Sequence, residues 1–499
     1  MGTLHGRKKR RFLPFLLVLA ALLLAAAAVF LLWRPLKGAP PAAEESATPG
    51  LTAEATPAEN AVSAPAPEAA QPLQAGLSRY EAVLKVDADQ MILYGNLRLT
   101  YVNRYAQSLF TVMLNLFPNA VSKDCLTLQT VTVEGLDAEY TLDESKTHLT
   151  LPLPRELRPG ESAKIYLSYL IRIPKTNERF GAGENRIMFG NCIPIAAEFE
   201  NGAWREDAYS DAGDSFYSSV ADYRVSIAAP KDYTLSCTGA VEEQRTEKGV
   251  TTVLAAAREV RDFAFCLHKN AYTALRTVNG VEVAGVARTQ KAAELAAQSG
   301  ADALAFFSEK ICEYPYPRFC VVDFDGSGGM EYPGLVMVDA TQFNARQENY
   351  AAMIVAHEAA HQWFYGIVGS DQLNEPWVDE SLAQFLGFDF IRNTMGDEAF
   401  EALWSYAFQK LPEYERTLRL DAPLTSFQGS DYFYVVYAYG AQMMRELYDA
   451  LGAEAFYAAL QNYVGEHRYQ NAKGSDLIAA FSEAAGKDMA AWFEAKMEP

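Results

Sequence analysis

Two histidines and a glutamate lie close together in the segment AAMIVAHEAAHQWFYGIV, which begins at residue 351. His357 and His361 are four residues apart, so a helix would place both imidazoles on one face, one turn from each other. Two imidazoles in that arrangement can bind one metal ion, and zinc accepts them readily. Glu358 lies beside them, where a carboxylate can take a proton from water at the metal. The pattern predicts a zinc site with a general base, although HExxH alone is short enough to occur by chance.

A catalytic zinc site needs a third protein ligand. The residue six positions after His361 is Ile367, which excludes the metzincin arrangement, and none of the other histidines in the chain is an easy choice. A carboxylate remains: Glu380 follows His361 with 18 residues between them, in a segment where a helix restarts at Pro376. A helix, a turn and a helix packed back antiparallel would place Glu380 opposite the two imidazoles. This set of ligands leaves the fourth zinc position open for a water molecule.

With these residues in place, the sequence resembles the membrane-alanyl-aminopeptidase (GxMEN) family of gluzincin zinc metallopeptidases. The HEAAH motif and its spacing to Glu380 fit, and residues 435–444, VVYAYGAQMM, are similar to the family's Y-x-K-G-A segment. The resemblance covers roughly residues 78–499, and Tyr439 stands where the family has a lysine. The G-x-M-E-N motif corresponds to five consecutive residues, the last of which is a tyrosine here: Gly328, Gly329, Met330, Glu331 and Tyr332.

The resemblance implies an aminopeptidase with one Zn²⁺ per chain, bound by His357, His361 and Glu380, and with peptides as substrates. It assigns catalytic roles to Glu358 as the general base and to Tyr437 as a hydrogen-bond donor to the developing oxyanion. It assigns the substrate's free α-amine to Glu331, with Gly328, Gly329 and Met330 beside it in the substrate-binding segment. The implied fold is an antiparallel, saddle-like β domain followed by an α+β thermolysin-like catalytic domain, in a compact form that lacks the helical C-terminal domain.

Several of these assignments have a structural alternative. Tyr437 could be one aromatic residue of a helix core, and Glu331 could be an incidental residue of a glycine turn. Asp379 and Glu375 could contact the metal ligands or could be exposed charges on a helix face. At the level of function, the alternatives to an aminopeptidase are a zinc endopeptidase, a narrow peptide-processing enzyme, and a surface protein that binds without turnover.

The N-terminus predicts a membrane anchor. RKKRR at residues 7–11 precedes 22 uncharged residues from Phe12 to Trp33, which would span roughly 33 Å as a helix against a hydrocarbon core of ~30 Å. The basic cluster predicts a cytoplasmic N-terminus in residues 1–34 and a body outside the cytoplasm. Residues 35–77 are rich in Ala, Pro, Glu, Ser and Thr and predict a linker. The alternative is a cleaved signal peptide, but its apolar stretch is shorter, about 7–15 residues, and ends in small residues. We therefore expect a single-pass protein of the cell membrane.

The chain after the predicted linker shows two patterns of hydrophobic periodicity. Residues 78–272 alternate apolar and polar side chains with a period of two, which predicts a mostly antiparallel β domain. Residues 273–499 predict a small sheet and then helices: helical spacing over 291–312 interrupted near Gly300, a helix from 348 through Gly366, and further helices over 376–395, 397–410, 435–450, 453–465 and 475–485. The second domain is thus expected to be α+β.

The net charge and the cysteine pattern argue against several other classes of function. The formal net charge is −20, and nucleic-acid binding needs a basic surface, so we expect no nucleic-acid partner. The six cysteines form no CxxC pair, which leaves thiolate zinc and thioredoxin-like chemistry without support. Buried free thiols are the favoured interpretation, although Cys312 and Cys320 are close enough in sequence to pair.

Overall fold

The computed structural model describes residues 76–499, apart from residue 211 and residues 344–347. These residues belong to one compact unit. The predicted membrane anchor at Phe12–Trp33 and almost all of the predicted linker lie outside the described residues. Within the described part of the chain, no helix has both the length and the apolar character needed to cross a bilayer.

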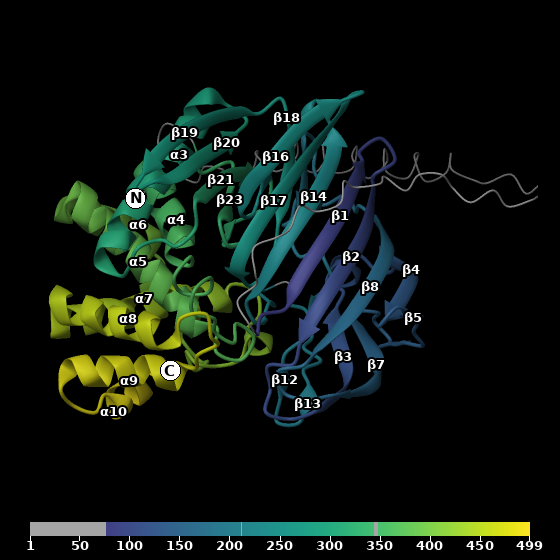
Figure 1. Ribbon diagram of the computed structural model, residues 1–499. Coiled ribbons are helices and arrows are strands. Elements are labelled where there is room, and N and C mark those ends of the chain that lie inside the picture. Colours follow the sequence, from purple (N-terminus) through teal and green to yellow (C-terminus); the bar gives the residue numbers. More distant parts are fainter. Residues whose placement is uncertain (1–75, 211, 344–347) are drawn as a thin grey trace, which may run out of the picture. The chain divides into compact units, whose positions relative to one another are not determined.

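An eight-stranded sheet dominates the first part of the chain (Figure 1). Buried and partly exposed residues alternate along most of β1, so that Tyr80, Ala82 and Leu84 all pack on one face, as a period of two requires. Neighbouring strands are antiparallel except β1 and β14, which are parallel. The order across the sheet is β16 (Ala240–Glu247), β17 (Val250–Val260), β14 (Ala221–Pro230), β1 (Arg79–Asp87), β2 (Ile92–Val102), β8 (Ser162–Arg172), β4 (Leu126–Val133) and β5 (Leu136–Asp137).

Smaller sheets accompany this one. The first contains β11 (Ile195–Ala196), β3 (Leu109–Asn115), β7 (His148–Leu157) and β6 (Thr141–Leu142), with the short helix α2 (Pro118–Val121) after β3. The second contains β15 (Tyr233–Cys237), β18 (Phe265–Lys269), β10 (Arg186–Phe189) and β9 (Phe180–Ala182). Strands β12 (Phe199–Glu200) and β13 (Ala203–Trp204) form a hairpin. The predicted β-rich N-terminal part is confirmed.

The second part begins with a five-stranded sheet in the order β19 (Tyr272–Val278), β20 (Val281–Ala287), β21 (Arg318–Phe324), β23 (Leu335–Asp339) and β22 (Gly329–Met330). β20, β21 and β23 are parallel, and β21 is buried along almost its whole length, as a strand covered on both faces must be. Helix α3 (Gln290–Lys310) packs on this sheet. It is continuous, so the predicted interruption near Gly300 is wrong: a Cβ there would lie 3.0 Å from Val321 and 3.1 Å from Val283, and glycine instead allows close packing.

The remaining elements are mainly helical, and with the mixed sheet they confirm the predicted α+β class. The helices are α4 (Glu348–Ala360), α5 (Trp377–Met395), α6 (Asp397–Ala407), α7 (Gly440–Leu451), α8 (Ala453–His467), α9 (Gly474–Ala485) and α10 (Ala490–Met497), with the 3₁₀ turns η1 (Leu411–Glu413) and η2 (Leu424–Ser426) and the π-helix η3 (Phe433–Tyr439). Two predicted features are wrong. α4 ends at Ala360 rather than at Gly366: turns follow it, and the φ of 128° at Tyr365 is incompatible with a helix that continues to Gly366. A π-helix replaces the start of the helix expected at 435.

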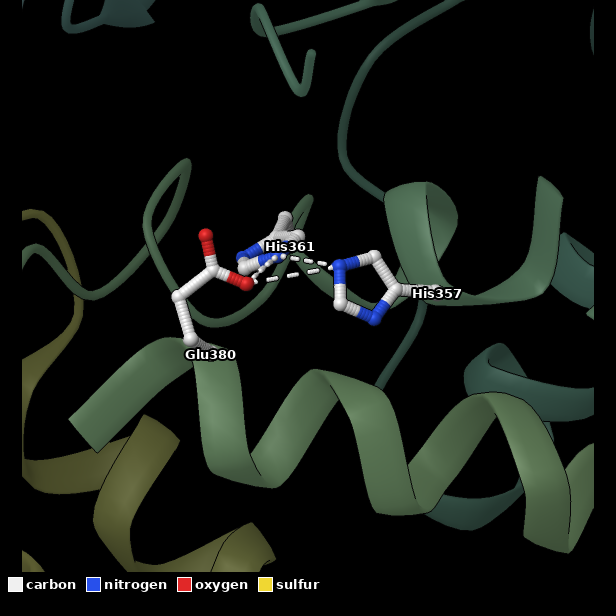
Figure 2. A group of neighbouring side chains, drawn as sticks. All are labelled: His357, His361 and Glu380. Atoms are coloured by element: carbon white, nitrogen blue, oxygen red, sulfur yellow. Dashed lines mark hydrogen bonds and ion pairs between the residues drawn. The ribbon is translucent and has the colours of Figure 1, made fainter. Parts of the chain in front are cut away.

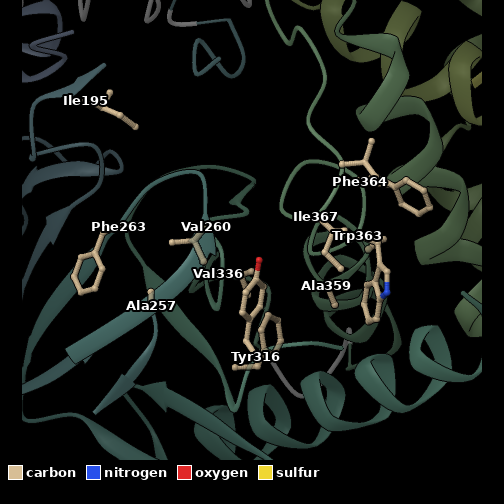
Figure 3. Packing of buried hydrophobic residues seen from close by; sticks show 14 of the residues in the cluster. Ile195, Ala257, Val260, Phe263, Tyr316, Val336, Ala359, Trp363, Phe364 and Ile367 are labelled. Carbon is tan, nitrogen blue, oxygen red and sulfur yellow. The ribbon is translucent and has the colours of Figure 1, made fainter. Parts of the chain in front are cut away.

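One hydrophobic core connects the two parts. It includes Ala257, Val260 and Phe263 from the β-rich part and Trp363 and Ile367 from the turns after α4 (Figure 3). Because the core continues across residues 272 and 273, the boundary placed there remains a prediction. All six cysteines are free, and all but Cys312 are buried, in agreement with the interpretation as buried thiols.

Candidate active site

Helices α4 and α5 cross closely and run antiparallel. Met353 and His357 lie against Gly387, where a Cβ would be 2.9 Å from the Met353 carbonyl oxygen and 3.2 Å from the His357 Cβ. Toward the end of α4 and the start of α5, His357 and His361, the latter just after α4, lie beside Glu380. Glycine at 387 therefore allows the two backbones to approach until the three side chains converge, as the predicted helix–turn–helix required.

The three predicted ligands point at one another (Figure 2). The Nε2 atoms of His357 and His361 are 3.2 Å apart, and each lies 3.4 Å from Oε2 of Glu380. All three side chains are buried. Zinc is bound by imidazole nitrogen and carboxylate oxygen at about 2.0–2.2 Å, so an ion among these three atoms needs only small side-chain adjustments.

The hydrogen bond that orients His361 fits a metal site. Nδ1 of His361 donates to the carbonyl oxygen of Phe364 at 3.0 Å. A carbonyl only accepts, so this bond places a proton on Nδ1, and Nε2 is the ring nitrogen that faces Glu380. Oε2 of Glu380 is buried without a hydrogen-bond donor. Three possible metal-ligand atoms therefore converge here, and a bound cation would give Oε2 of Glu380 a partner.

The β-rich part holds the turn that carries His361. Arg261, fully buried at the end of β17, donates from Nε to the carbonyl oxygen of Tyr365 and from Nη1 to that of Ser218 at 2.6 Å. The Tyr365 hydroxyl donates to Asp262 at 2.5 Å. These bonds fix the residues just after His361, and through the Phe364 carbonyl they also fix its imidazole.

Glu358, the predicted base, lies on α4 against the glycine loop. A Cβ on Gly329 would lie 1.9 Å from Oε1 of Glu358, so only glycine leaves room for this carboxylate. The pKa of Glu358 is raised to about 8, chiefly by burial and also by the charge of Glu380, while His361 acts in the opposite direction. A divalent cation nearby would lower this pKa. Oε1 of Glu358 lies 4.0 Å from Nε2 of His357, so the carboxylate is within reach of a water molecule at the proposed metal, where a general base would act.

Tyr437, on the π-helix η3, lies beside His357. Its ring stacks on that of His357, with centroids 5.9 Å apart and planes 25° from parallel. The π-helix is tied to α5 beside Glu380: Oγ of Ser381 donates to the Val436 carbonyl oxygen at 2.8 Å, and a Cβ on Gly440 would lie 2.0 Å from that Oγ. π-helical segments occur frequently at functional sites. Tyr437 is thus placed at the predicted metal site rather than in a distant helix core.

Glu331 is buried next to the predicted ligands. One carboxylate oxygen from each of Asp214, Glu331 and Glu380 lies within 4.8 Å of the others. Oε1 of Glu331 accepts a hydrogen bond from Nε2 of Gln372 at 2.9 Å, and the Arg179 guanidinium pairs with Asp214. Glu331 is therefore part of a buried carboxylate cluster and not an incidental residue of a turn.

The cluster carries more negative than positive groups, and the pKa values reflect this. Burial raises the pKa of Glu331 well above its ordinary value, and the charges of Asp214 and Glu380 add to the effect. Burial likewise raises the pKa of Asp379 to about 7, reinforced by Glu380. Burial opposes ionisation of Glu380 too, but the interactions with His357 and His361 outweigh it and lower its pKa. The Arg179 guanidinium offsets part of this negative charge, and further cations would stabilise the ionised carboxylates.

The departures from the family motifs turn away from the cluster. Tyr332 is fully buried, and its hydroxyl donates to Asn191 at 2.6 Å. The Arg416 guanidinium lies over the ring of Tyr439, 5.2 Å from the ring centroid.

Of the two acidic residues that could contact the metal ligands, Asp379 is buried and accepts from the backbone N–H of Glu380 at 2.9 Å. Glu375, which is half-buried, accepts instead from the backbone N–H of Gly474 at 3.2 Å. Of these two acidic residues, only Asp379 is part of the cluster.

Three residues of the cluster were not predicted from the sequence: Asp214, Arg179 and Gln372. Asp214 and Arg179 come from loops of the β-rich part, where no motif marks them, and only the fold brings them to Glu331. Gln372 had a signal: it lies between His361 and Glu380, in the loop that must return the chain to the metal ligands. Polar residues in that loop are candidates for contacts with the site.

Comparisons with known proteins agree with this geometry. Residues 295–495 match the Peptidase family M1 domain. The chain is 30% identical to Aminopeptidase N of Lactococcus lactis subsp. lactis over 256 residues, which are 45% of this chain and 29% of that protein. It is also 30% identical to Aminopeptidase M1 of Arabidopsis thaliana, over 46% of this chain and 28% of that protein. The chain therefore spans less than a third of the length of these curated relatives.

A solved structure extends the likeness in fold over most of the chain. A variant of the M1 zinc metallopeptidase from Deinococcus radiodurans superimposes with a TM-score of 0.65 at 18% identity, covering 85% of this chain and 94% of that one. The likeness includes the β-rich part, which the matched domain at 295–495 does not reach. It shows that the arrangement of a β-rich domain before an α+β domain is shared with that protein.

Proposed function

We propose that this protein is a zinc-dependent aminopeptidase that removes N-terminal residues from peptides outside the cytoplasm. The observation that carries the proposal is the buried cluster itself. Three ligand atoms converge within 3.4 Å at one end, and the carboxylates of Glu331 and Asp214 lie at the other. One end suits a metal ion and the other suits a free ammonium group. The match to the Peptidase family M1 domain and the likeness to aminopeptidases N support the same activity.

His357, His361 and Glu380 would hold one zinc ion per chain. A zinc ion held this way supplies Lewis-acid chemistry, because it polarises a carbonyl oxygen and lowers the pKa of water from 15.7 toward ~7. Asp379 would stabilise this set, because it accepts the backbone N–H of Glu380 and so orients the residue that carries the third ligand.

Glu358 and Tyr437 would perform the proton transfer and the hydrogen bonding. The Glu358 carboxylate accepts a proton from the attacking water and later delivers it to the leaving amine. The hydroxyl of Tyr437, whose ring stacks on that of His357, would donate a hydrogen bond to the oxyanion that develops on the scissile carbonyl. Donors of this kind contribute ~10²–10³ in rate.

Glu331 would bind the substrate's α-ammonium and so select the N-terminal residue. The ammonium is one residue from the scissile carbonyl, so holding it at Glu331 places the first peptide bond at the metal. Gly328 has a φ of +77° and Gly329 packs against Glu358, so the chain before Glu331 turns tightly beside the base. Met330 packs against the Arg179 guanidinium, its sulfur 3.0 Å from Nη1.

Replacement of Glu331 tests the exopeptidase character. Glu331→Ala is expected to lower kcat/KM for an alanyl anilide by at least ~30-fold, the effect of removing one partner from a buried charge pair, with zinc content unchanged. N-acetylation of the substrate should cost the wild type a similar factor and the variant little, because the variant has already lost the partner of the ammonium. A wild type that cleaves acetylated and free peptides equally well would instead be an endopeptidase.

We also propose, from the sequence, that residues Phe12–Trp33 anchor the protein in the cell membrane with its body outside the cytoplasm. Protease added to intact cells should then release a fragment that begins within residues 35–77, detected by N-terminal sequencing, while a cytoplasmic marker protein stays intact. Recovery of a soluble chain without residues 1–33 from untreated cells would show a cleaved signal peptide instead.

A further inference from the structure

Gln372 connects the proposed amine anchor to the helix that carries the third metal ligand. Its side chain is 2% exposed. Nε2 donates to Oε1 of Glu331 at 2.9 Å and to Oδ2 of Asp379 at 3.0 Å. Glu331 follows β22, whereas Asp379 lies in the first turn of α5, next to Glu380. One amide group thus joins two elements that are 48 residues apart in sequence.

An uncharged amide is the group suited to this place. Its two N–H bonds serve two carboxylates, one each, and it adds no positive charge that would compete with a substrate ammonium for Glu331. A lysine here would neutralise the anchor, and a glutamate would add a further negative charge to a buried cluster. The amide oxygen of Gln372 is buried without a donor. The two carboxylates only accept hydrogen bonds, so the NH₂ group of the amide has to face them. This orientation leaves the amide oxygen unsatisfied, which costs free energy.

The bond to Asp379 attaches the Gln372 side chain to the start of α5. Oδ1 of Asp379 accepts from the backbone N–H of Glu380 at 2.9 Å, so the carboxylate that Gln372 contacts is fixed to the start of α5. The backbone of the anchor is held separately: Nε2 of Gln362, the residue after His361, lies 3.4 Å from the Glu331 carbonyl oxygen, and its Oε1 accepts from the N–H of Gly334 at 2.8 Å. Gln362 therefore fixes the main chain, which leaves the position of the Glu331 carboxylate to Gln372.

We propose that Gln372 is a positioning residue for amine recognition: it holds the Glu331 carboxylate at a set distance from the metal ligands and so determines how strictly the enzyme requires a free N-terminus. This inference rests on the proposed aminopeptidase function. It assigns Gln372 no contact with the metal or the scissile bond.

Gln372→Met keeps the size of the side chain and removes both hydrogen bonds. It is expected to lower kcat/KM for alanyl p-nitroanilide by ~10- to 100-fold, the range for buried hydrogen bonds to charged groups. Most of the loss should appear as a higher KM, because the ammonium is bound in the ground state and in the transition state alike. The preference for the free over the N-acetylated substrate should fall by the same factor, while zinc content stays at the wild-type level.

Two controls separate positioning from damage to the fold. Gln290→Met removes the same type of bond, from Nε2 to Glu294 at 2.7 Å, on an exposed helix start far from the site in sequence, and should leave both kinetic constants unchanged. Gln372→Met in the Glu331→Ala background should cost little beyond Glu331→Ala alone, because the carboxylate that Gln372 positions is already absent. Independent structural damage would instead add to the effect of Glu331→Ala.

The outcomes distinguish this inference from the proposed function. If the wild type prefers the free-amine substrate but Gln372→Met keeps that preference and its KM, or if the two substitutions are additive, Gln372 does not position the anchor. If the wild type itself shows no preference for a free amine, the proposed aminopeptidase function fails first.

Discussion

Glu358→Gln is expected to bind zinc like the wild type and to lose nearly all turnover. An amide has the size and shape of the carboxylate but cannot accept a proton, so the space against Gly329 stays filled while the proton transfer is lost. General-base catalysis contributes ~10²–10⁴ in rate. We therefore expect kcat to fall by at least ~10²-fold. Bound zinc measured on the same preparation should remain at the wild-type level, because none of the three proposed ligands changes.

The matched control for this variant is Glu348→Gln at the start of the same helix. Glu348 is exposed and paired with Lys291 at 2.6 Å, and surface pairs of this kind contribute ~0–1 kcal/mol. Its replacement should leave kcat unchanged. Full activity in Glu358→Gln would show that another group accepts the proton, and the assignment of the base would be wrong.

Glu380→Ala is expected to lose the metal itself. Without this carboxylate only two imidazoles remain, one ligand short of a catalytic zinc site. The affinity for zinc should fall by more than the 10–100-fold that changes outside the ligand set produce. Dialysed protein should then contain almost no zinc and show no measurable hydrolysis, and a zinc titration should give a much weaker dissociation constant.

Glu375→Ala serves as the control for the loss of metal. Glu375 lies five residues earlier, accepts from the Gly474 N–H and contacts none of the proposed ligands in the described structure. This variant should keep its zinc. Retention of wild-type zinc affinity by Glu380→Ala would exclude Glu380 as a ligand and leave only the two histidines of the proposed set.

The site residues whose positions depend on local spacing could be predicted from the sequence. His357, Glu358 and His361 lie within one helical turn and its continuation, and Glu380 begins the next helix, so a single antiparallel crossing brings them together. The fold class followed from periodicity: alternation marked the β-rich part, and helical spacing marked the segments after residue 348. These features require only neighbouring elements.

Features that depend on long-range packing could not be predicted. Asp214 reaches Glu331 only because a loop of the β-rich part packs on the catalytic part, and no local pattern reports that contact. Gly300 interrupts the helical pattern of the sequence, but its position against Val321 and Val283 makes it a site of close packing. The turn after Ala360 is held by Arg261 and Asp262, about a hundred residues earlier, which bind Tyr365.

The most direct test of the central claim is hydrolysis by the wild-type protein with its zinc content controlled. Zinc is removed with a chelator and then added back stepwise, and initial rates are measured for alanyl p-nitroanilide and for its N-acetylated form. We predict that the rate on the free-amine substrate falls to background in the zinc-free protein, returns in proportion to bound zinc up to one ion per chain, and exceeds the rate on the acetylated substrate throughout. Full activity without zinc, or equal rates on the two substrates, would contradict the proposal of a zinc aminopeptidase.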